Sequence, residues 1–298
     1  MSICPACGSS SAAFLTAYNG FELLKCSCCD LAYTAQRDFS TDQYQNVYSG
    51  VHAYLGMKDA ARRTHQGELG YRHLWWSKRL ALRWLKKFVP KGKVLDLGSG
   101  PGTFLMIAQK DFKYEVQGVE PASEPASMAT SFNIPTFNGT LEEFDKNNKE
   151  KYDAIVSFEV LEHLTDPLSV LTTARRMLKS NGVLILSVPN LDDPYCLRQQ
   201  IAPAMPPIHI NFFSRRSLEA MLNRSGFTLE RTFSLPIPTS SVRNVHGKTG
   251  FALRLPYLVL TWLLGQQDGT TLLAMARPSS SNVNPIFEFS EAAEARSS

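Results

Sequence analysis

The chain has 298 residues, of which 44% are hydrophobic and 19% are charged, and its formal net charge is +4. This length and apolar content are enough for one full hydrophobic core with a small appendage. Because the net charge is modest for the length, long-range attraction to nucleic acid is weak. We therefore expect one main globular domain, and this charge balance does not favour nucleic acid as its partner.

The cysteines are concentrated near the start of the chain. Five of the six lie within residues 4–29, and Cys196 is the sixth. Two C-x-x-C pairs are separated by the eighteen residues 8–25, a spacing typical of a structural zinc ribbon. The four candidate zinc ligands are Cys4, Cys7, Cys26 and Cys29. Four thiolates close a tetrahedral site, so this zinc would fold the segment rather than take part in catalysis.

A disulfide framework is the alternative for these cysteines. We see no signal peptide, and the long remainder of the chain holds one further cysteine, so an oxidising compartment is not expected. Cys28 is left over from the two pairs and could replace Cys29 only in a tighter knuckle. Within residues 1–37 only Lys25 and Arg37 are basic, which leaves no basic stripe for phosphates. The sequence thus predicts a cytoplasmic protein whose ribbon contacts a substrate pocket or another subunit.

Two apolar segments outside the ribbon need an assignment. Residues 66–89 carry apolar and aromatic side chains at helical spacing, among them Trp75 and Trp76. They predict a helix that packs against a sheet and covers the ligand site at its edge. The run 255–264 contains Pro256 and has about half of the ~20 residues that a membrane span requires. We expect no transmembrane segment and assign this run to packing or dimerisation.

Residues 94–105, VLDLGSGPGTFL, place an apolar strand, an acid and three alternating glycines directly before a helix. The glycines lack a Cβ, so the backbone can turn sharply and approach a ligand closely, and the helix from Thr103 points its N–H groups at that ligand. A dinucleotide fingerprint would need glycine at position 103. The Asp96 carboxylate suits a ligand with an ammonium and a sulfonium. An ordinary Gly-rich loop is the alternative.

Several segments after the glycine turn have strand patterns. They are 114–120, 152–158, 182–188, 227–235 and 270–276, with helices predicted over 168–179 and 214–226. Glu120 closes the first of them, about 20 residues after the turn, where a carboxylate can accept from both ribose hydroxyls. Alternating strands and helices indicate a parallel sheet covered on both faces. The last two strands lack the usual helical crossover and suit an antiparallel pair.

At these residues the chain resembles the class I S-adenosylmethionine-dependent methyltransferases. The resemblance covers roughly residues 93–277 and implies an α/β, Rossmann-like sheet of seven strands with the last strand antiparallel. It also implies S-adenosylmethionine as cofactor, held mainly by the glycine turn and by Glu120 at the end of the strand 114–120. The candidate cofactor-binding residues are Asp96, Gly98, Ser99, Gly100, Gly102, Glu120, Pro121, Phe158 and Glu159.

Candidate catalytic residues follow the strand 152–158. A helical turn there would bring Glu159 alongside Glu162 and His163, and His209 lies in a proline-rich loop before an aromatic pair. This pattern resembles the ubiquinone-precursor O-methyltransferases and the small-RNA 2′-O-methyltransferases. The resemblance implies that Glu159, Glu162, His163 and His209 bind a divalent ion that lowers the pKa of vicinal hydroxyls. With two histidines, manganese or a transition metal is favoured over magnesium.

Other roles for these histidines remain open. His163 or His209 could act as a general base near neutral pH without a metal, or could be an ordinary hydrogen-bonding residue, since similar Glu-His-Leu turns occur in metal-free methyltransferases. The segment 42–48, DQYQNVY, resembles the entry segment of bacterial zinc-ribbon methyltransferases that act on sugars and secondary metabolites. The sugar C-methyltransferases among them carry a further C-terminal domain, for which this chain is too short.

We therefore predict four regions: a zinc ribbon over 1–40, a helical linker and cap over 41–90, a methyltransferase domain over 91–277, and a disordered tail over 278–298. The predicted reaction moves the methyl of S-adenosylmethionine to a hydroxyl oxygen of a small-molecule or glycan acceptor. Transfer to carbon or nitrogen is the enzymatic alternative. A different class of function would be a ribbon module that methylates or binds a protein or RNA partner. A homodimer is left open.

Overall fold

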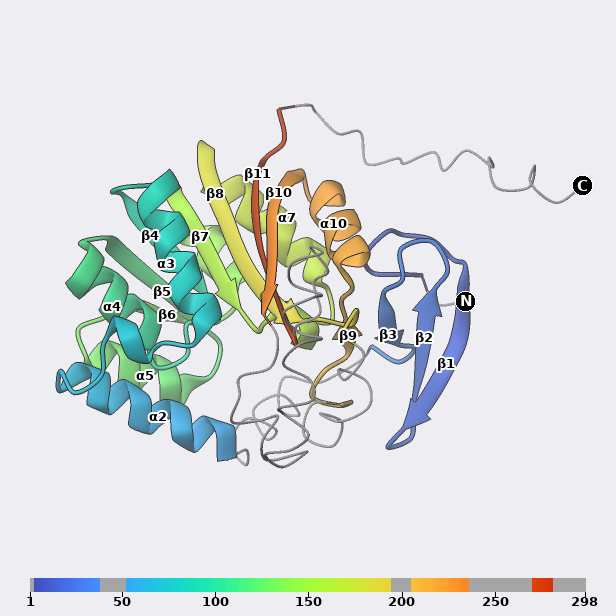
Figure 1. The fold of residues 1–298 in the computed structure, drawn as a ribbon, viewed down its shortest axis with the longest axis horizontal. Coiled ribbons are helices and arrows are strands. Elements are labelled where there is room, and N and C mark those ends of the chain that lie inside the picture. The colour runs from blue at the N-terminus through green and yellow to red at the C-terminus, as the bar shows by residue number, and fades with distance from the viewer. Residues whose placement is uncertain (1–2, 38–51, 194–204, 236–269, 281–298) are drawn as a thin grey trace, which may run out of the picture.

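The computed structural model describes residues 3–37, 52–193, 205–235 and 270–280. They form a sheet of seven strands flanked by helices and a smaller sheet of four strands beside it (Figure 1). Three predicted features lie outside the described residues: the apolar run 255–264, the segment 42–48 and most of the tail after 278. Among the described residues, no helix has the length and apolar character needed to cross a membrane.

The larger sheet has the strand order β10-β11-β8-β7-β4-β5-β6. The five strands from β4 to β8 run parallel, whereas β11 pairs antiparallel with both β8 and β10. This confirms the predicted Rossmann-like methyltransferase sheet with a reversed last strand. The bounds are β4 (Lys93–Leu97), β5 (Glu115–Glu120), β6 (Thr136–Asn138), β7 (Tyr152–Phe158), β8 (Leu178–Pro189), β10 (Phe227–Leu235) and β11 (Thr271–Pro278).

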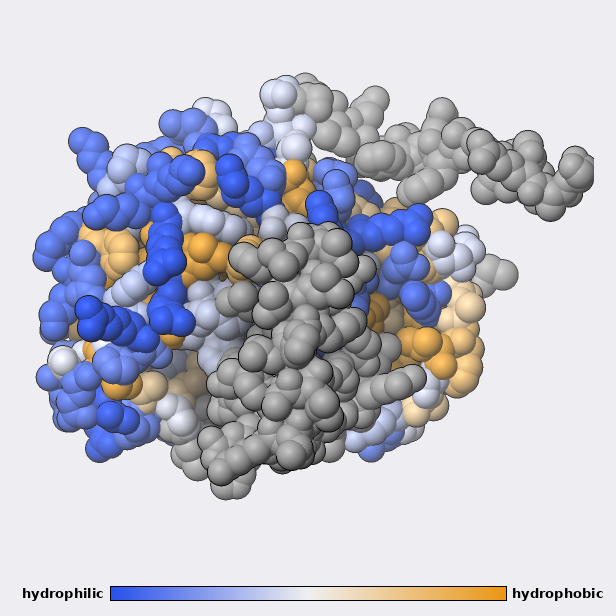
Figure 2. Space-filling model, in the orientation of Figure 1, coloured by the Kyte–Doolittle hydropathy of each residue, from blue (hydrophilic) through white to orange (hydrophobic). Residues whose placement is uncertain are grey.

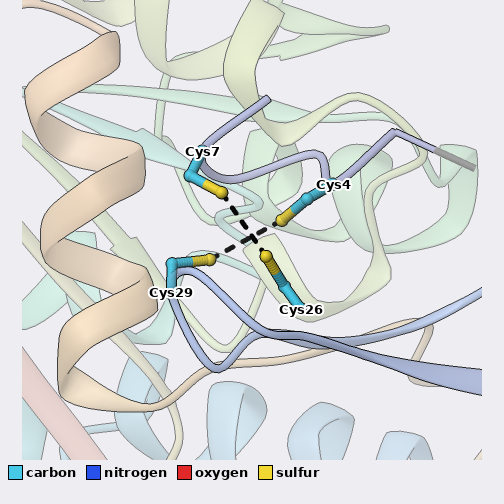
Figure 3. Close-up of side chains that lie close together, drawn as sticks. All are labelled: Cys4, Cys7, Cys26 and Cys29. Atoms are coloured by element: carbon cyan, nitrogen blue, oxygen red, sulfur yellow. Dashed lines mark hydrogen bonds between the residues drawn. The ribbon is translucent and has the colours of Figure 1, made fainter. Parts of the chain in front are cut away.

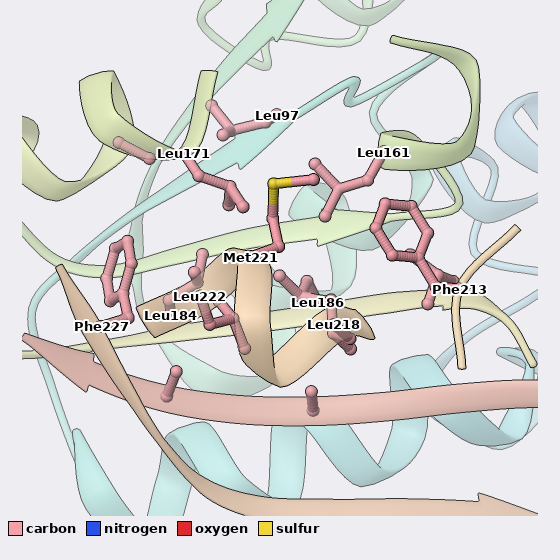
Figure 4. Close-up of a cluster of buried hydrophobic side chains, with 14 of the residues drawn as sticks. Leu97, Leu161, Leu171, Leu184, Leu186, Phe213, Leu218, Met221, Leu222 and Phe227 are labelled. Carbon is pink, nitrogen blue, oxygen red and sulfur yellow. The ribbon is translucent and has the colours of Figure 1, made fainter. Parts of the chain in front are cut away.

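Helices cover both faces of this sheet, and the strands alternate to meet them. On β4, Leu95 and Leu97 join one buried apolar cluster, whereas Val94 joins the cluster on the opposite face. In the first cluster Met221 points from α10 toward Leu161 and Leu171 (Figure 4). The flanking helices are α4 (Thr103–Phe112), α5 (Ser123–Ser131), α6 (Leu141–Asn147), α7 (Pro167–Met177) and α10 (Arg215–Arg224), with a short 3-10 helix η2 (Leu161–His163).

Local signals place the starts of α4, α7 and α10 to within one residue. Ser214 caps α10, and its hydroxyl accepts a hydrogen bond from the Ser217 N–H at 3.1 Å. The helix predicted over 168–179 begins at Pro167 after the Asp166 cap, but it ends at Met177. Strand β8 already starts at Leu178, four residues earlier than predicted, because those residues pair with the start of β7.

The helix predicted over 66–89 is correct only in its second half. The structure has α2 (His52–His65), a 3-10 helix η1 (Tyr71–His73) and then α3 (Trp76–Phe88). Gly67 adopts a φ of +81°, a left-handed conformation that ends helical structure at this point. Helix α3 buries Ala81, Leu82 and Leu85 against the sheet. The linker region therefore contains two separate helices rather than one long helix.

The smaller sheet contains the cysteine-rich segment. Its order is β1-β2-β3-β9, with antiparallel pairing throughout. The strands are β1 (Ala12–Tyr18), β2 (Phe21–Cys26), β3 (Ala32–Thr34) and β9 (Asn211–Phe212). The first three strands form the predicted ribbon, which lies beside α10 in Figure 1. The fourth strand comes from more than halfway along the chain, so the ribbon is built into the methyltransferase domain.

The N-terminal segment exposes several apolar side chains. Ile3 and Phe14 are 65% and 64% exposed, and Leu15 is also exposed. In Figure 2 hydrophobic side chains gather on the same side of the molecule as β1 and β2. Scattered exposed apolar residues are normal, but a group on one small sheet is a feature of contact surfaces.

Candidate functional site

The glycine turn lies at the carboxyl end of β4 and has the backbone that the sequence predicts. Gly98 and Gly100 adopt φ values of +70° and +55°, which residues with a Cβ rarely tolerate. A Cβ at position 98 would lie 2.6 Å from Cγ2 of Val160. The N–H groups of Gly98 and Ser99 donate to the Val119 carbonyl at 2.9 and 3.2 Å. The turn is therefore held against β5, and Gly102 caps the start of α4 in a left-handed conformation.

Asp96 precedes this turn and is 2% exposed. Among the described residues, its Oδ1 atom has no hydrogen-bond partner. Burial raises the pKa of Asp96 to about 7, even though the charge of Lys78 acts in the opposite direction. A buried acceptor without a partner is costly. A cationic group such as the ammonium of S-adenosylmethionine would satisfy this oxygen and favour its charged form.

Glu120 ends β5 with its carboxylate fixed at both oxygens. Oε2 accepts from the Gly100 N–H at 2.8 Å, and Oε1 accepts from the Ala122 N–H at 2.9 Å. Burial raises the pKa of Glu120, and these two hydrogen bonds partly offset that rise. Each carboxylate oxygen can accept more than one hydrogen bond. The carboxylate is thus held at the carboxyl end of β5 and keeps capacity to accept further hydrogen bonds. Pro121 follows, and its carbonyl accepts from the Asn138 side chain at 3.1 Å.

Phe158 lies at the carboxyl end of β7, next to the glycine turn. Its ring centroid is 4.8 Å from that of Phe104 in α4, and its side chain is buried. Nζ of Lys78 lies 5.3 Å from the centroid of the Phe158 ring. Sequence reasoning missed Lys78, because a lysine in an amphipathic helix normally faces solvent. Here α3 brings this half-buried cation close to Phe158, and its charge lowers the pKa of Asp96.

Helix α2, which precedes the predicted segment 66–89, also contacts the glycine turn. A Cβ at Gly100 would lie 3.1 Å from Cε of Met57 in α2. The same helix forms an ion pair between Lys58 and Glu124 of α5, and His65 stacks on Phe132 with ring centroids 4.4 Å apart. In Figure 1, α2 runs beside α5 at the edge where the parallel strands end. Helix α2 therefore bounds the edge of the sheet at which the glycine turn lies.

Glu159 does not lie where a helical turn would place it. Its φ is +57°, and η2 begins two residues later at Leu161. The side chain is exposed, and Oε1 accepts a hydrogen bond from Ser187 Oγ at 2.7 Å. The prediction of Glu159 one turn away from Glu162 and His163 is therefore wrong. The chain leaves β7 in a left-handed conformation, so no helical turn starts at Glu159, although its charge still acts on Glu162.

Glu162, His163 and His209 do come together, and we call them the acceptor cluster. One potential ligand atom from each lies within 4.8 Å of the others. The two imidazole centroids are 4.7 Å apart at an angle of 71°. Nδ1 of His163 lies 2.8 Å from the Ile208 carbonyl, which can only accept, so Nδ1 carries the proton. Nε2 then offers its lone pair on the side of Glu162, 3.9 Å away.

The electrostatics of the acceptor cluster favour a bound cation. Burial lowers the pKa of His163 to about 4 and that of His209 to about 3, so both imidazoles are neutral at neutral pH. Burial also raises the pKa of Glu162, and the charge of Glu159 raises it further. Neither carboxylate oxygen of Glu162 finds a hydrogen-bond partner in the described part of the chain. A divalent ion would satisfy these buried acceptors together.

The four predicted cysteine ligands also converge, as Figure 3 shows. The sulfurs of Cys4 and Cys29 are 3.6 Å apart, those of Cys7 and Cys26 are 3.5 Å apart, and all four lie within 4.8 Å of one another. Tetrahedral zinc with Zn–S bonds of ~2.3 Å needs sulfurs about 3.8 Å apart. The thiols are free, and burial raises the pKa of Cys7 to about 12, a cost that a cation would offset. Cys28 instead donates to Ser9 Oγ at 3.2 Å.

Comparison with known proteins assigns the family. A family model described as a methyltransferase domain matches residues 70–232, which are 163 of the 298 residues. The chain belongs to this family. Together with the sheet order and the glycine turn, this makes the domain a class I S-adenosylmethionine-dependent methyltransferase domain. The matched range begins within the linker and ends in β10.

Curated relatives include ubiquinone biosynthesis O-methyltransferases. The protein of Actinobacillus pleuropneumoniae is 35% identical over 108 residues, which cover 33% of this chain and 46% of that protein. The Haemophilus ducreyi protein is 37% identical over 110 residues, with 33% and 45% covered. The matches thus span less than half of the length of these relatives.

A solved complex between the Trm112 methyltransferase activator of Haloferax volcanii and a methyltransferase contains a similar chain. The TM-score is 0.54 at 16% sequence identity, and the match covers 81% of this chain and all of that one. At this identity the similarity shows the fold alone.

Proposed function

We propose that this protein transfers the methyl group of S-adenosylmethionine to a hydroxyl oxygen of a small-molecule acceptor with the help of a divalent ion. One observation carries the proposal. The acceptor cluster brings a buried carboxylate and two neutral imidazoles within 4.8 Å, and two of its members, Glu162 and His163, follow β7, the strand paired with β4. The printed names of the curated relatives, O-methyltransferases, support the same type of reaction.

On the donor side, each residue has a distinct task. The Asp96 carboxylate accepts from the ammonium of S-adenosylmethionine, and the Lys78 ammonium lies within reach of the same end of the cofactor to attract its carboxylate. Glu120 accepts from the ribose hydroxyls, while the backbone of Gly98 and Gly100 lets the cofactor approach closely. The cofactor supplies a sulfonium-bound methyl group as electrophile. Direct displacement requires the acceptor oxygen in line with that methyl, so catalysis is mostly a matter of positioning.

On the acceptor side, Glu162, His163 and His209 would hold the ion, and Glu159 stands at the edge outside this set. Two nitrogen ligands favour manganese or a transition metal over magnesium. Such an ion lowers the pKa of a bound hydroxyl. A metal-free general base fits this buried site less well, because burial lowers the pKa of both histidines well below neutrality and makes them weak bases.

At the N-terminus, the ribbon would hold a structural zinc ion through Cys4, Cys7, Cys26 and Cys29. A filled four-thiolate site has no open position, so its role is to fold the segment 1–40. Free thiols fit a reducing compartment, which is consistent with a cytoplasmic protein. The division into ribbon, cap over 41–90, catalytic domain over 91–277 and a tail remains our proposal, with β9 shared between ribbon and catalytic domain.

The test is a screen of hydroxylated acceptors with methyl-labelled S-adenosylmethionine, in parallel with Mn²⁺ and with a chelator. We expect label on the oxygen of a small molecule with neighbouring hydroxyls, and only with the ion present. Zinc content is measured in every sample, so that loss of the ribbon zinc is not mistaken for loss of the catalytic ion. Label on carbon or nitrogen, or on a protein or an RNA, would contradict the proposed reaction.

A variant pair separates catalysis from binding. His209→Ala should abolish methyl transfer while calorimetry still detects binding of the demethylated cofactor. His73→Ala, at an exposed histidine in η1, is the matched control and should keep full activity. If His209→Ala turned over at the wild-type rate, the acceptor cluster would have no catalytic role.

A further inference from the structure

The cysteine-rich ribbon contacts the acceptor cluster through backbone pairing. Strand β3 pairs with β9, with Tyr33 opposite Asn211, only two residues after His209. The Thr34 N–H donates to the Ile210 carbonyl at 3.0 Å. The residues that follow His209 are therefore a strand of the ribbon sheet, and the position of the ribbon sets the path of the loop that carries this histidine.

A second connection reaches the turn that carries Glu162 and His163. Arg37, just after β3, donates through Nη2 to the carbonyls of Leu164 and Thr165 at 3.1 and 2.7 Å. Its Nε atom also donates to the Thr165 carbonyl at 3.1 Å. These two carbonyls follow His163 directly. One guanidinium thus joins the end of the ribbon to the end of η2, with the fork geometry that a lysine cannot reproduce.

The two segments that carry the cluster are also joined to each other. Asn211 is buried, and its Nδ2 atom donates to the carbonyls of Leu161 and Leu164 at 3.0 and 2.8 Å. The Ile210 N–H donates to the carbonyl of Glu162 at 2.8 Å. Together with the bond from His163 to the Ile208 carbonyl, these contacts make η2 and the strand β9 one unit. A displacement of the ribbon would therefore be transmitted to the loop before β9 and to η2.

The ribbon itself depends on its cysteine site. Its buried interior consists largely of Cys4, Cys26, Cys29 and a few apolar residues that join the cluster under α10. A segment of this size does not build its own core, so metal binding and folding are coupled. From α10, Arg224 donates to the carbonyls of Pro5 and Ala6 at 3.4 and 2.9 Å, which fixes the first knuckle on the domain.

From these contacts we propose that the metal-filled ribbon positions the acceptor cluster, with Arg37 and Asn211 as positioning residues, so that loss of the ribbon metal disables the acceptor side selectively. The donor side is supported differently: the glycine turn hydrogen bonds with β5, and α2 contacts it through Met57. The effect on methyl transfer rests on the proposed function, but the effect on the structure of the cluster does not.

Hydrogen exchange measured by mass spectrometry tests the structural part on the full protein. Peptides from 161–165 and 205–212 should exchange faster, by about tenfold or more, after zinc is removed from the ribbon, since local opening controls exchange. Peptides from 96–102 and 115–120 should keep their rates. Unchanged exchange in the first group would overturn the proposal. Equal acceleration in both groups would also overturn it, because the ribbon would then support the whole fold.

Arg37 provides a test that leaves the zinc site untouched. Arg37→Ala should weaken Mn²⁺ binding about tenfold, as outer-shell changes do, and should accelerate exchange in the same two segments. Arg37→Lys should recover part of the loss. Arg216→Ala is the matched control, since Arg216 of α10 pairs with Asp30 of the ribbon at 3.1 Å on the surface. Affinity for the demethylated cofactor should be unchanged in all three.

The two proposals fail in distinguishable ways. If the wild-type protein bound no Mn²⁺ and needed none, the ion-assisted reaction would be wrong, while the exchange pattern would still report on the ribbon. If the wild-type protein bound Mn²⁺ and Arg37→Ala bound it equally well with unchanged exchange, the positioning role would be wrong and the reaction would stand.

Discussion

The donor and acceptor sides of the site are built in different ways. The donor side comes mostly from one stretch, 94–120, in which strand, glycine turn, helix and second strand follow one another. The acceptor side joins three segments that are far apart in the chain: 34–37, 161–165 and 208–212. A contiguous turn can be read from local backbone requirements, whereas a cluster assembled across the fold exists only through tertiary contacts.

The two sides nevertheless share one electrostatic feature. Each buries a carboxylate with oxygen atoms that have no hydrogen-bond partner within the described residues: Oδ1 of Asp96 on the donor side, and both oxygens of Glu162 on the acceptor side. Burial raises the pKa of both residues. Each carboxylate is thus prepared for a cation, an organic one at Asp96 and a metal ion at Glu162. The difference lies in the partners, since only Glu162 has two neutral imidazoles beside it.

The largest effect is expected at Glu162. Glu162→Gln should lower methyl transfer by about hundredfold or more, because the ion loses its anionic ligand. Binding of the demethylated cofactor should be unchanged. Since burial raises the pKa of Glu162, a charged carboxylate at this position does not stabilise the ion-free fold, so the variant should unfold no earlier than the wild type. Thermal unfolding, calorimetry and labelled turnover check these results.

Glu219→Gln is the control for this variant, because Glu219 is exposed on α10. Its turnover and stability should match the wild type. Normal turnover by the Glu162→Gln protein would show that no ion bound at Glu162 takes part in the reaction.

A smaller effect is expected at Asp96. Asp96→Asn should weaken binding of S-adenosylmethionine by about 1.5–3 kcal/mol, the value of a hydrogen bond to a charged group. Because the pKa of Asp96 is raised to about 7 in the free protein, a cationic ligand should bind more tightly above pH 7 than below it. Binding below pH 7 should release a proton, since the ligand favours the ionised carboxylate.

Calorimetry in two buffers of different ionisation enthalpy measures this proton release. The Asp96→Asn variant should lose it, while Asp111→Asn, at an exposed acid in α4, should keep it. Equal proton release in Asp96→Asn and wild type would assign the linkage to another group, such as Glu120, and would weaken the role of Asp96.

A separate effect, on the stability of the fold rather than on turnover or ligand binding, is expected at the turn itself. Gly98→Ala combines a positive φ with a Cβ 2.6 Å from Val160, so the free energy of unfolding should fall by about 2–4 kcal/mol. Gly20→Ala is the matched comparison: its φ is +80°, but a Cβ there meets nothing within 4 Å, so only about 1–2 kcal/mol is expected. Chemical denaturation measures both. Equal losses of unfolding free energy in the two variants would mean that the contact with Val160 adds no cost to that of the left-handed backbone.

Much of the donor side could be predicted from the sequence. Short-range patterns predict the strands β4, β5 and β7, the cap at Ser214 and the reversed last strand, and the structure has all of them. The prediction failed where a residue acts through distant contacts. Lys78 looks like a solvated helix residue, and Glu159 looks like the start of a helix until its φ of +57° is known. Helix α2, which contacts the glycine turn, lies about 40 residues ahead of it.

The sequence by itself determined the elements whose formation depends on neighbours along the chain: alternating apolar strands, glycines in left-handed turns, capped helices and the paired C-x-x-C spacing. The tertiary structure alone decided that His209 meets His163, that β9 completes the ribbon sheet and that Arg37 reaches the end of η2. The physical reason is that a backbone turn is restricted by the sterics of its own residues. A cluster needs the closure of long loops, which the packing of the whole domain provides.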